Sequence, residues 1–167
     1  MHEIVLAAGR EVRHLQLIIY EYLKEALDWA AGELDALDLI ALVEEDKAQL
    51  WLIFGEESRK LRAVATTMVV QYPRLKVVRV VTLAGEGMDE WAGELAERLE
   101  KFARGQECQR LEAFGRKGLE KKLGKLGFRA QYVTLVKEVE GGEDGQVCRI
   151  DANGLDYESA SVPATIH

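Results

Sequence analysis

Three β-rich segments follow one another between residues 49 and 83, with no helical segment between them. Residues 49–54 and 61–72 flank a short polar segment that is typical of a hairpin turn. Residues 75–83 have a Val-rich middle, which favours a strand buried on both faces of a sheet. The three segments therefore predict an antiparallel hairpin that leads into a central strand.

Helical patterns are expected before and after this hairpin. Residues 3–8 are a short apolar run that predicts a strand, and apolar residues at helical spacing predict a helix over 11–30. Asp35 and Asp38 can cap a second helix that runs to about Asp46. The remaining patterns predict a helix capped by Asp89 and ended by Gly105, a strand at 109–114, a helix at 117–126 and a long strand at 128–139.

The predicted order is β-α-α-β-β-β-α-β-α-β. It implies an α/β (α+β) fold in which a mixed central sheet of about six strands is flanked by four helices. A chain of 167 residues has the size of one ordinary domain, which we expect at 1–139. Residues 140–167 are an acidic, Gly-rich tail without periodicity, expected to be extended and ordered only by contacts with a protein partner or with other copies of the chain.

The charge of the chain argues against some classes of partner. Its formal net charge is −7, whereas nucleic-acid binders usually present a basic face. Lysines and arginines at 116–125 form either a solvated helix face or an anion site. Cys108 and Cys148 have no partner at metal-ligand spacing, which indicates a reduced intracellular protein without a metal site, and Cys108 is expected to be a small buried apolar residue. No run approaches the roughly 20 apolar residues of a membrane span.

The order of elements resembles the GNAT superfamily of acyl-CoA N-acyltransferases over residues 3–139. Residues 77–85 (Val-Val-Arg-Val-Val-Thr-Leu-Ala-Gly) resemble its fourth strand and the entry to its cofactor loop, and 91–105 resemble the helix that follows. Lys-Leu-Gly-Phe at 125–128 is similar to the signature that closes the last helix. Gly-Arg-Lys-Gly-Leu at 115–119 also resembles a branch of the superfamily encoded by bacteriophages.

The resemblance implies where an acyl-CoA would bind. The family's loop carries an Arg/Gln-x-x-Gly-x-Gly/Ala pattern, whose backbone N–H groups hold a pyrophosphate at a helix N-terminus. The equivalents here are Leu83, Gly85, Gly87 and Ala92, of which Gly87 replaces the Arg or Gln and only Ala92 fits the pattern. Acidic residues lie in or beside this loop, either as helix caps or as part of a modified cofactor loop: Glu86, Asp89 and Glu90.

This sequence lacks some of the residues that the family uses for acyl transfer. Leu123 stands where the resemblance places a Tyr that reprotonates the CoA thiolate, and Arg116 stands where it places an Asn. Arg116 is either a surface residue or part of an anion site. The third and fourth strands offer no carboxylate as a general base, and Tyr72 and Tyr132 are phenol donors or packing residues. No residue is assigned as catalytic.

Two functions remain open. The residues favour a GNAT-fold protein with an eroded acyl-CoA site and no cofactor, acting as a binding or structural protein of a phage virion or its assembly. Such a protein would lie in the cytoplasm of the host cell or in the virion. The alternative is an active N-acyltransferase that uses acetyl-CoA or another acyl-CoA and an unknown amine.

Overall fold

The structure is a computed structural model that describes residues 2–28, 34–55, 59–115, 117–137, 150–151 and 154–155. The chain divides into two compact units, Met1–Ala130 and Gln131–His167. The first unit contains the sheet and helices that form the candidate site. No helix among the described residues combines the length and the apolar character needed to cross a membrane.

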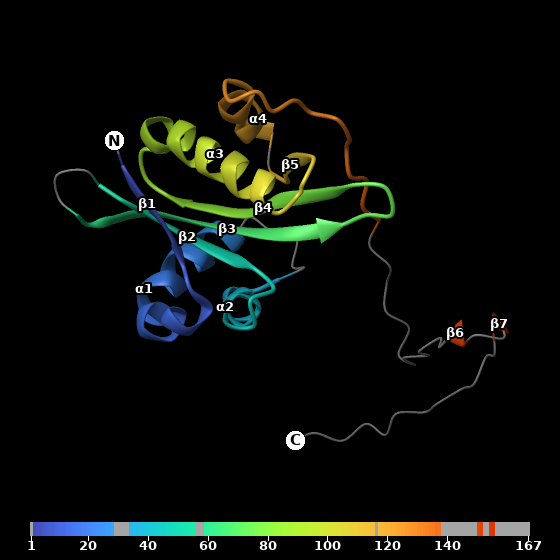
Figure 1. Cartoon of the computed structure of the whole chain (residues 1–167), viewed down its shortest axis with the longest axis horizontal. Helices are drawn as coiled ribbons and strands as arrows, with labels where there is room; N and C mark the ends of the chain where they lie inside the picture. Colours follow the sequence, from blue (N-terminus) through green and yellow to red (C-terminus); the bar gives the residue numbers. More distant parts are fainter. Residues whose placement is uncertain are drawn as a thin grey trace, which may run out of the picture. The chain divides into compact units, whose positions relative to one another are not determined.

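A five-stranded mixed sheet forms the centre of the first unit (Figure 1). Its strands are β1 (Glu3–Ala7), β2 (Gln49–Phe54), β3 (Leu61–Gln71), β4 (Lys76–Gly85) and β5 (Arg110–Ala113). They lie side by side in chain order; β1 to β4 pair antiparallel, and β5 pairs parallel to β4. The predicted hairpin and the mixed sheet are confirmed, although this sheet has five strands rather than about six. The strand expected to be central is β4, an interior strand that lies next to the edge strand β5, and β3 is the middle strand.

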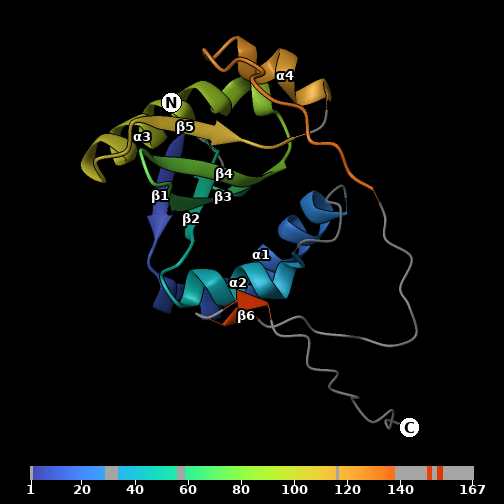
Figure 2. The same ribbon diagram turned by 90° about the vertical axis from the view of Figure 1, so that its right-hand side faces the viewer.

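Helices cover both faces of the sheet (Figures 1 and 2). They are α1 (Gly9–Leu27), α2 (Ala36–Glu44), α3 (Met88–Gly105) and α4 (Lys117–Gly124). One core cluster joins α1 and α2 to one face and includes Val12 and Leu39, which are fully buried. The other joins α3 to the opposite face and includes Trp91 and Leu95. Because side chains alternate across a strand, successive strand residues belong to the two clusters in turn.

The helix caps follow local side-chain chemistry. Asp35 caps α2 as predicted, since its Oδ1 accepts from the Asp38 N–H at 2.7 Å and its own N–H donates to Asp38 Oδ2 at 3.1 Å. The predicted cap of α3 is wrong. That helix begins at Met88, with Gly87 as its N-cap, and Asp89 lies inside the first turn. The first helix spans Gly9–Leu27, and residues 29–30 of its predicted range lie outside the described residues.

The predicted strand at 128–139 is not found. Residues 128–137 are assigned to no strand, and residues 138–139 lie outside the described residues. The segment has strand-favouring residues, but β propensity measures how well a residue fits an existing sheet and does not supply a partner. In the second unit, Ile150–Asp151 (β6) and Gly154–Leu155 (β7) pair antiparallel. The partner-dependent order expected for residues 140–167 stays a prediction.

Candidate functional site

The candidate site begins where β4 and β5 part. Their parallel ladder runs from the pair Val77 and Arg110 to the pair Val80 and Ala113. Beyond Val80, β4 continues to Gly85, while β5 has ended. Among the described residues, no strand pairs with β4 on this side beyond Val80. The N–H and C=O groups of an unpaired strand edge are free to bind an extended, amide-containing chain.

A β-bulge marks the same point on the other edge of β4. The register between β3 and β4 shifts at Thr66 and Thr67, so that Val81 is the extra residue. The buried hydroxyls of Thr66 and Thr82 bond to each other at 2.8 Å beside the bulge, which satisfies both polar groups. Bulges bend a strand and raise its twist, and the bulge therefore helps to turn the end of β4 away from β5.

An apolar slot lies beside the free stretch of β4. Val80 and Leu83 of β4 line it together with Ala92 and Ala96 of α3, and Leu123 of α4 closes it. Leu126 and Phe128 add to the same wall. The cavity inside is about 20 Å³, room for about one water molecule. A ligand chain can therefore enter the slot only if the α4 side chains move away from β4.

Two glycines shape the loop between β4 and α3. Gly85 has φ +124°, and a Cβ there would lie 2.4 Å from the carbonyl oxygen of Arg62 on the neighbouring strand. Gly87 has φ +65° and is the N-cap of α3, where no side chain caps the helix. The loop is further fixed by the Trp91 indole N–H, which donates to the Glu86 carbonyl oxygen at 2.8 Å. Because glycine has no side chain, the first N–H groups of α3 receive no side-chain cap from this residue.

Two of the three loop acids form ion pairs with neighbouring elements. Glu90 Oε2 accepts from Arg62 Nη1 of β3 at 2.8 Å. Asp89 Oδ2 lies 3.5 Å from Lys122 Nζ of α4, so this pair joins α4 to the start of α3. Each pair sets a positive charge against the carboxylate, which weakens the repulsion between that carboxylate and any anion bound at the loop. Glu86 is exposed at the loop.

A cluster of charged and aromatic side chains lies beside the same end of the β4–β5 ladder. Arg79 Nη2 is within hydrogen-bond distance of the Tyr72 hydroxyl and lies 3.3 Å from Glu112 Oε2. Arg110 Nη2 donates to Glu112 Oε1 at 2.6 Å, and the Tyr72 hydroxyl donates to Glu112 Oε2 at 3.1 Å. The Arg79 guanidinium carbon lies 4.6 Å from the ring centroid of Phe114. Tyr72 was noted from the sequence as a phenol donor or packing residue, but Glu112 was missed.

The surroundings of Glu112 set its protonation. Burial alone raises the pKa of this carboxyl, but hydrogen bonds from Arg110, Tyr72 and Arg79 favour the charged form more strongly. The net result is a pKa below the ordinary value for glutamate. Glu112 is therefore a carboxylate at neutral pH and a weak base. Its only signal in the sequence is a charged residue inside the strand predicted at 109–114.

The loop residues named from the resemblance come together at the site, and the other sequence candidates do not. Leu83, Gly85, Gly87 and Ala92 do come together around the start of α3. Arg116 is outside the described residues. Tyr132 belongs to the second unit, and Cys108 is half-buried rather than fully buried. The described residues contain no cluster of three or more side chains suited to holding a metal ion.

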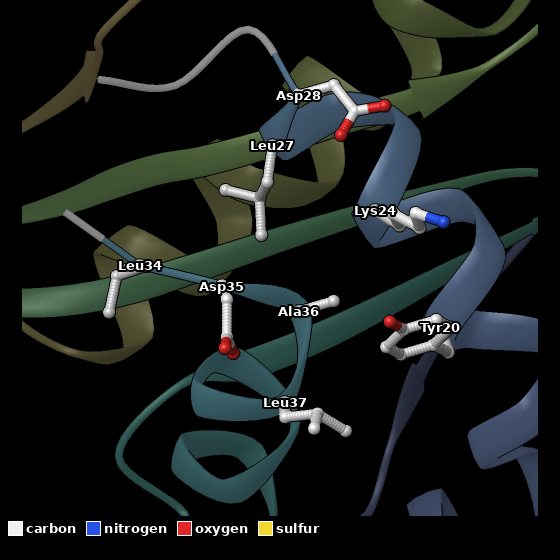
Figure 3. A pocket seen from close by; sticks show the side chains of 8 residues that line it. All are labelled: Tyr20, Lys24, Leu27, Asp28, Leu34, Asp35, Ala36 and Leu37. Atoms are coloured by element: carbon white, nitrogen blue, oxygen red, sulfur yellow. The ribbon is translucent and has the colours of Figure 1, made fainter. Parts of the chain in front are cut away.

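A larger hollow of about 170 Å³ lies between the end of α1 and the start of α2 (Figure 3). Tyr20, Lys24 and Asp28 of α1 line one side, and Asp35 and Leu37 line the other. The Asp35 carboxylate already caps α2. Since the remaining groups do not converge on one point in Figure 3, this hollow offers less chemistry than the end of β4.

The strand order, the parted β4 and β5 and the layered helices together define the GNAT fold, which N-acetyltransferases share. The resemblance inferred from residues 77–85 and 125–128 is thus confirmed for the fold, while the bacteriophage branch stays a prediction. No protein-family model matches the sequence, and no curated protein sequence matches it. Solved structures, however, match it over most of its length.

Three of these structures illustrate the likeness. A probable acetyltransferase has a TM-score of 0.63 and 14% identity, covering 84% of this chain and 99% of that chain. The ribosomal-protein-alanine N-acetyltransferase of Brucella melitensis has a TM-score of 0.61 and 16% identity, covering 84% and 100%. A predicted acetyltransferase of Clostridium acetobutylicum, solved with acetyl-CoA, has a TM-score of 0.60 and 14% identity, covering 83% and 96%. At these identities the likeness is one of fold.

Proposed function

We propose that this protein is an acyl-CoA-dependent N-acyltransferase. The observation that carries the proposal is the free edge of β4 beyond Val80, which lies beside an apolar slot and leads to a helix N-terminus without a side-chain cap. A pantetheine arm carries amides that can pair with such an edge and methylene groups that suit the slot. Its pyrophosphate would then meet the first N–H groups of α3, an arrangement that favours anions.

The proposed reaction needs few side chains. The amine nitrogen attacks the thioester carbonyl, the C–N bond forms, and the C–S bond breaks. The amine gives up a proton and the CoA thiolate takes one up, so that an amide and free CoA result. Leu123 of α4 cannot donate that proton, and we therefore assign the catalysis to the positioning of the two substrates, with water carrying the protons.

The assembly role preferred from the sequence receives less support. Several solved structures that resemble this chain are described as acetyltransferases, which favours the enzyme. The strongest argument for an eroded site was the acidity of the loop. Asp89 and Glu90 are paired with Lys122 and Arg62, and that argument is weaker as a result.

Thermal unfolding with and without acetyl-CoA tests the proposal. A ligand at about 100 times its dissociation constant stabilises the native state by about 2.7 kcal/mol. For a protein of this size, we therefore expect the melting temperature to rise by about 5–10 °C. Ala96 is half-buried and lines the slot, so Ala96→Phe should fill the slot and abolish this rise in melting temperature.

Ala26→Phe is the matched control, because Ala26 is also a half-buried helical alanine but lies on α1, away from the slot. It should keep the full rise in melting temperature. No rise in the wild type at millimolar acetyl-CoA would refute the proposal, as would an equal rise in the Ala96→Phe variant.

A further inference from the structure

The cluster around Arg79 lies on the opposite face of the sheet from the apolar slot. Val80 lines the slot and packs with the α3 residues, and side chains alternate along a strand. Arg79 therefore projects to the other face. Its strand partner Met68 packs against the core cluster of α1 and α2, which agrees with this placement. The slot and the cluster thus meet at one point, the end of the β4–β5 ladder, from opposite faces.

The guanidinium of Arg79 is the least satisfied group of this cluster. Both Arg79 and Arg110 contact Glu112. The Arg79 and Glu112 side chains are largely withdrawn from water, with exposed fractions of 24% and 17%. Arg79 Nε is buried without a hydrogen-bond partner, and it is the single such side-chain nitrogen or oxygen among the residues that the structure describes. A buried guanidinium N–H calls for one more acceptor, and an anionic acceptor makes the strongest hydrogen bond with it.

An exposed aromatic ring covers the guanidinium of Arg79. Phe114 directly follows β5, and 66% of its surface is exposed. Its ring stacks on the Arg79 guanidinium at 4.6 Å. A ring with so little packing of its own can turn aside at small cost, and this would open the guanidinium to a ligand.

We infer that the Arg79 cluster binds the anionic group of the acyl acceptor, so that the acceptor is a small amine carrying a carboxylate or a phosphate. The inference rests on the proposed acyl transfer. Arg79 and Val80 are consecutive, and an anion held at Arg79 therefore leaves a nearby amine close to the place where β4 and β5 part. Glu112 is unsuited to hold the amine itself, because its two oxygens already accept from Arg110, Tyr72 and Arg79.

Binding of paired small amines to the full chain, without acyl-CoA, tests the inference. The probes are 2-aminoethyl phosphate against ethanolamine, and glycine against glycinamide. Backbone amide shifts of residues 76–80 and 110–114 are followed by NMR. We expect at least one of the two anionic amines to shift these amide resonances. The matching amine without the anionic group, ethanolamine or glycinamide, should leave them unchanged. The anionic amine that binds more tightly identifies the group as a phosphate or a carboxylate. If neither binds, or if each pair binds alike, the inference is wrong.

Two substitutions in the cluster should change the affinity for the anionic amine in opposite directions. Arg79→Gln should weaken binding of the anionic amine at least tenfold, whereas Arg104→Gln, an exposed ion-paired arginine on α3, should leave it unchanged. Glu112→Gln removes the negative charge of the Glu112 side chain from the cluster and should tighten binding at least threefold. A purely structural cluster predicts equal or weaker binding in Glu112→Gln, and that result overturns the inference even if Arg79→Gln does not fold.

The amine-binding test and the acetyl-CoA test can fail independently of each other. If acetyl-CoA stabilises the protein but no anionic amine binds at Arg79, the acceptor inference alone fails. If acetyl-CoA has no effect while 2-aminoethyl phosphate or glycine binds at Arg79, the transferase proposal fails and the anion site stands without its role as an acceptor site.

Discussion

Glu112 shows how much one side chain can depend on its neighbours. It lies on the edge strand of the sheet, yet only 17% of its side chain is exposed, and three donors from β4, β5 and the turn before β4 converge on it. Burying a charge is costly unless hydrogen bonds replace its lost water. In Glu112 the hydrogen bonds outweigh the effect of burial, and the pKa of the carboxyl therefore falls rather than rises.

The lowered pKa predicts a pH dependence of stability. A carboxyl whose folded-state pKa is depressed contributes stability above its unfolded pKa, about 4.3 for glutamate, and loses it as the pH falls through the folded value. We expect the wild type to unfold at higher denaturant than Glu112→Gln at pH 7, and this difference to shrink below about pH 4.

Arg110→Gln removes one of the donors to Glu112 and should reduce the pH-dependent part of the stability. Urea unfolding monitored by circular dichroism between pH 3 and pH 7 measures all three proteins. A difference between wild type and Glu112→Gln that stays constant over this range would contradict the account of the cluster.

At the scale of elements, α2 and α3 begin in different ways. The capping box of Asp35 and Asp38 satisfies two N–H groups at the start of α2. The N-cap of α3 is Gly87, and the acids of its first turn bond to Arg62 and Lys122 instead of to the backbone. One helix start is capped by its own side chains, and the other has no side-chain cap.

The cap of α2 gives a stability prediction. Asp35→Ala removes the acceptor of the Asp38 N–H and should lower the free energy of unfolding by about 1 kcal/mol. Glu25→Ala, an exposed change on α1, should alter it by no more than about 0.5 kcal/mol. Urea denaturation of the three proteins at pH 7 measures the difference. Equal stabilities of Asp35→Ala and wild type would show that the capping box contributes nothing.

Sequence patterns predicted elements better than they predicted pairing. The hairpin, the strand that follows it and the Asp35 cap were all predictable, because each depends on residues close in the chain. The strand expected at 128–139 failed, since a strand needs a partner that the pattern does not name. The cap at Asp89 failed because a glycine with positive φ precedes the helix and Lys122 engages the carboxylate.

The candidate site shows the same limit. The loop residues Leu83, Gly85, Gly87 and Ala92 could be placed from the resemblance, since they follow one another in sequence. The cluster of Tyr72, Arg79 and Glu112 could not, because it forms only when β4 and β5 align in register. Nor could the ion pairs of Asp89 and Glu90, whose partners lie on α4 and β3.

At the scale of the first unit, the sheet separates two chemically different faces. Helices α3 and α4 lie on one side of the sheet and α1 and α2 on the other (Figure 2). The apolar slot is on the α3 and α4 side, and the strand partner of Arg79, Met68, packs on the α1 and α2 side. The faces meet where β4 leaves β5, after Val80. A transfer reaction between two bound molecules needs such a meeting point, and in our account each substrate approaches it from its own face.

A crystal structure of the protein with CoA tests this account most directly. We predict that the pantetheine arm lies along β4 beyond Val80, with its phosphates at the N–H groups of Met88 and Asp89, and with Leu123 and Leu126 moved away from Leu83. The result that would contradict the account is CoA bound elsewhere on the chain while α4 still closes the slot over β4.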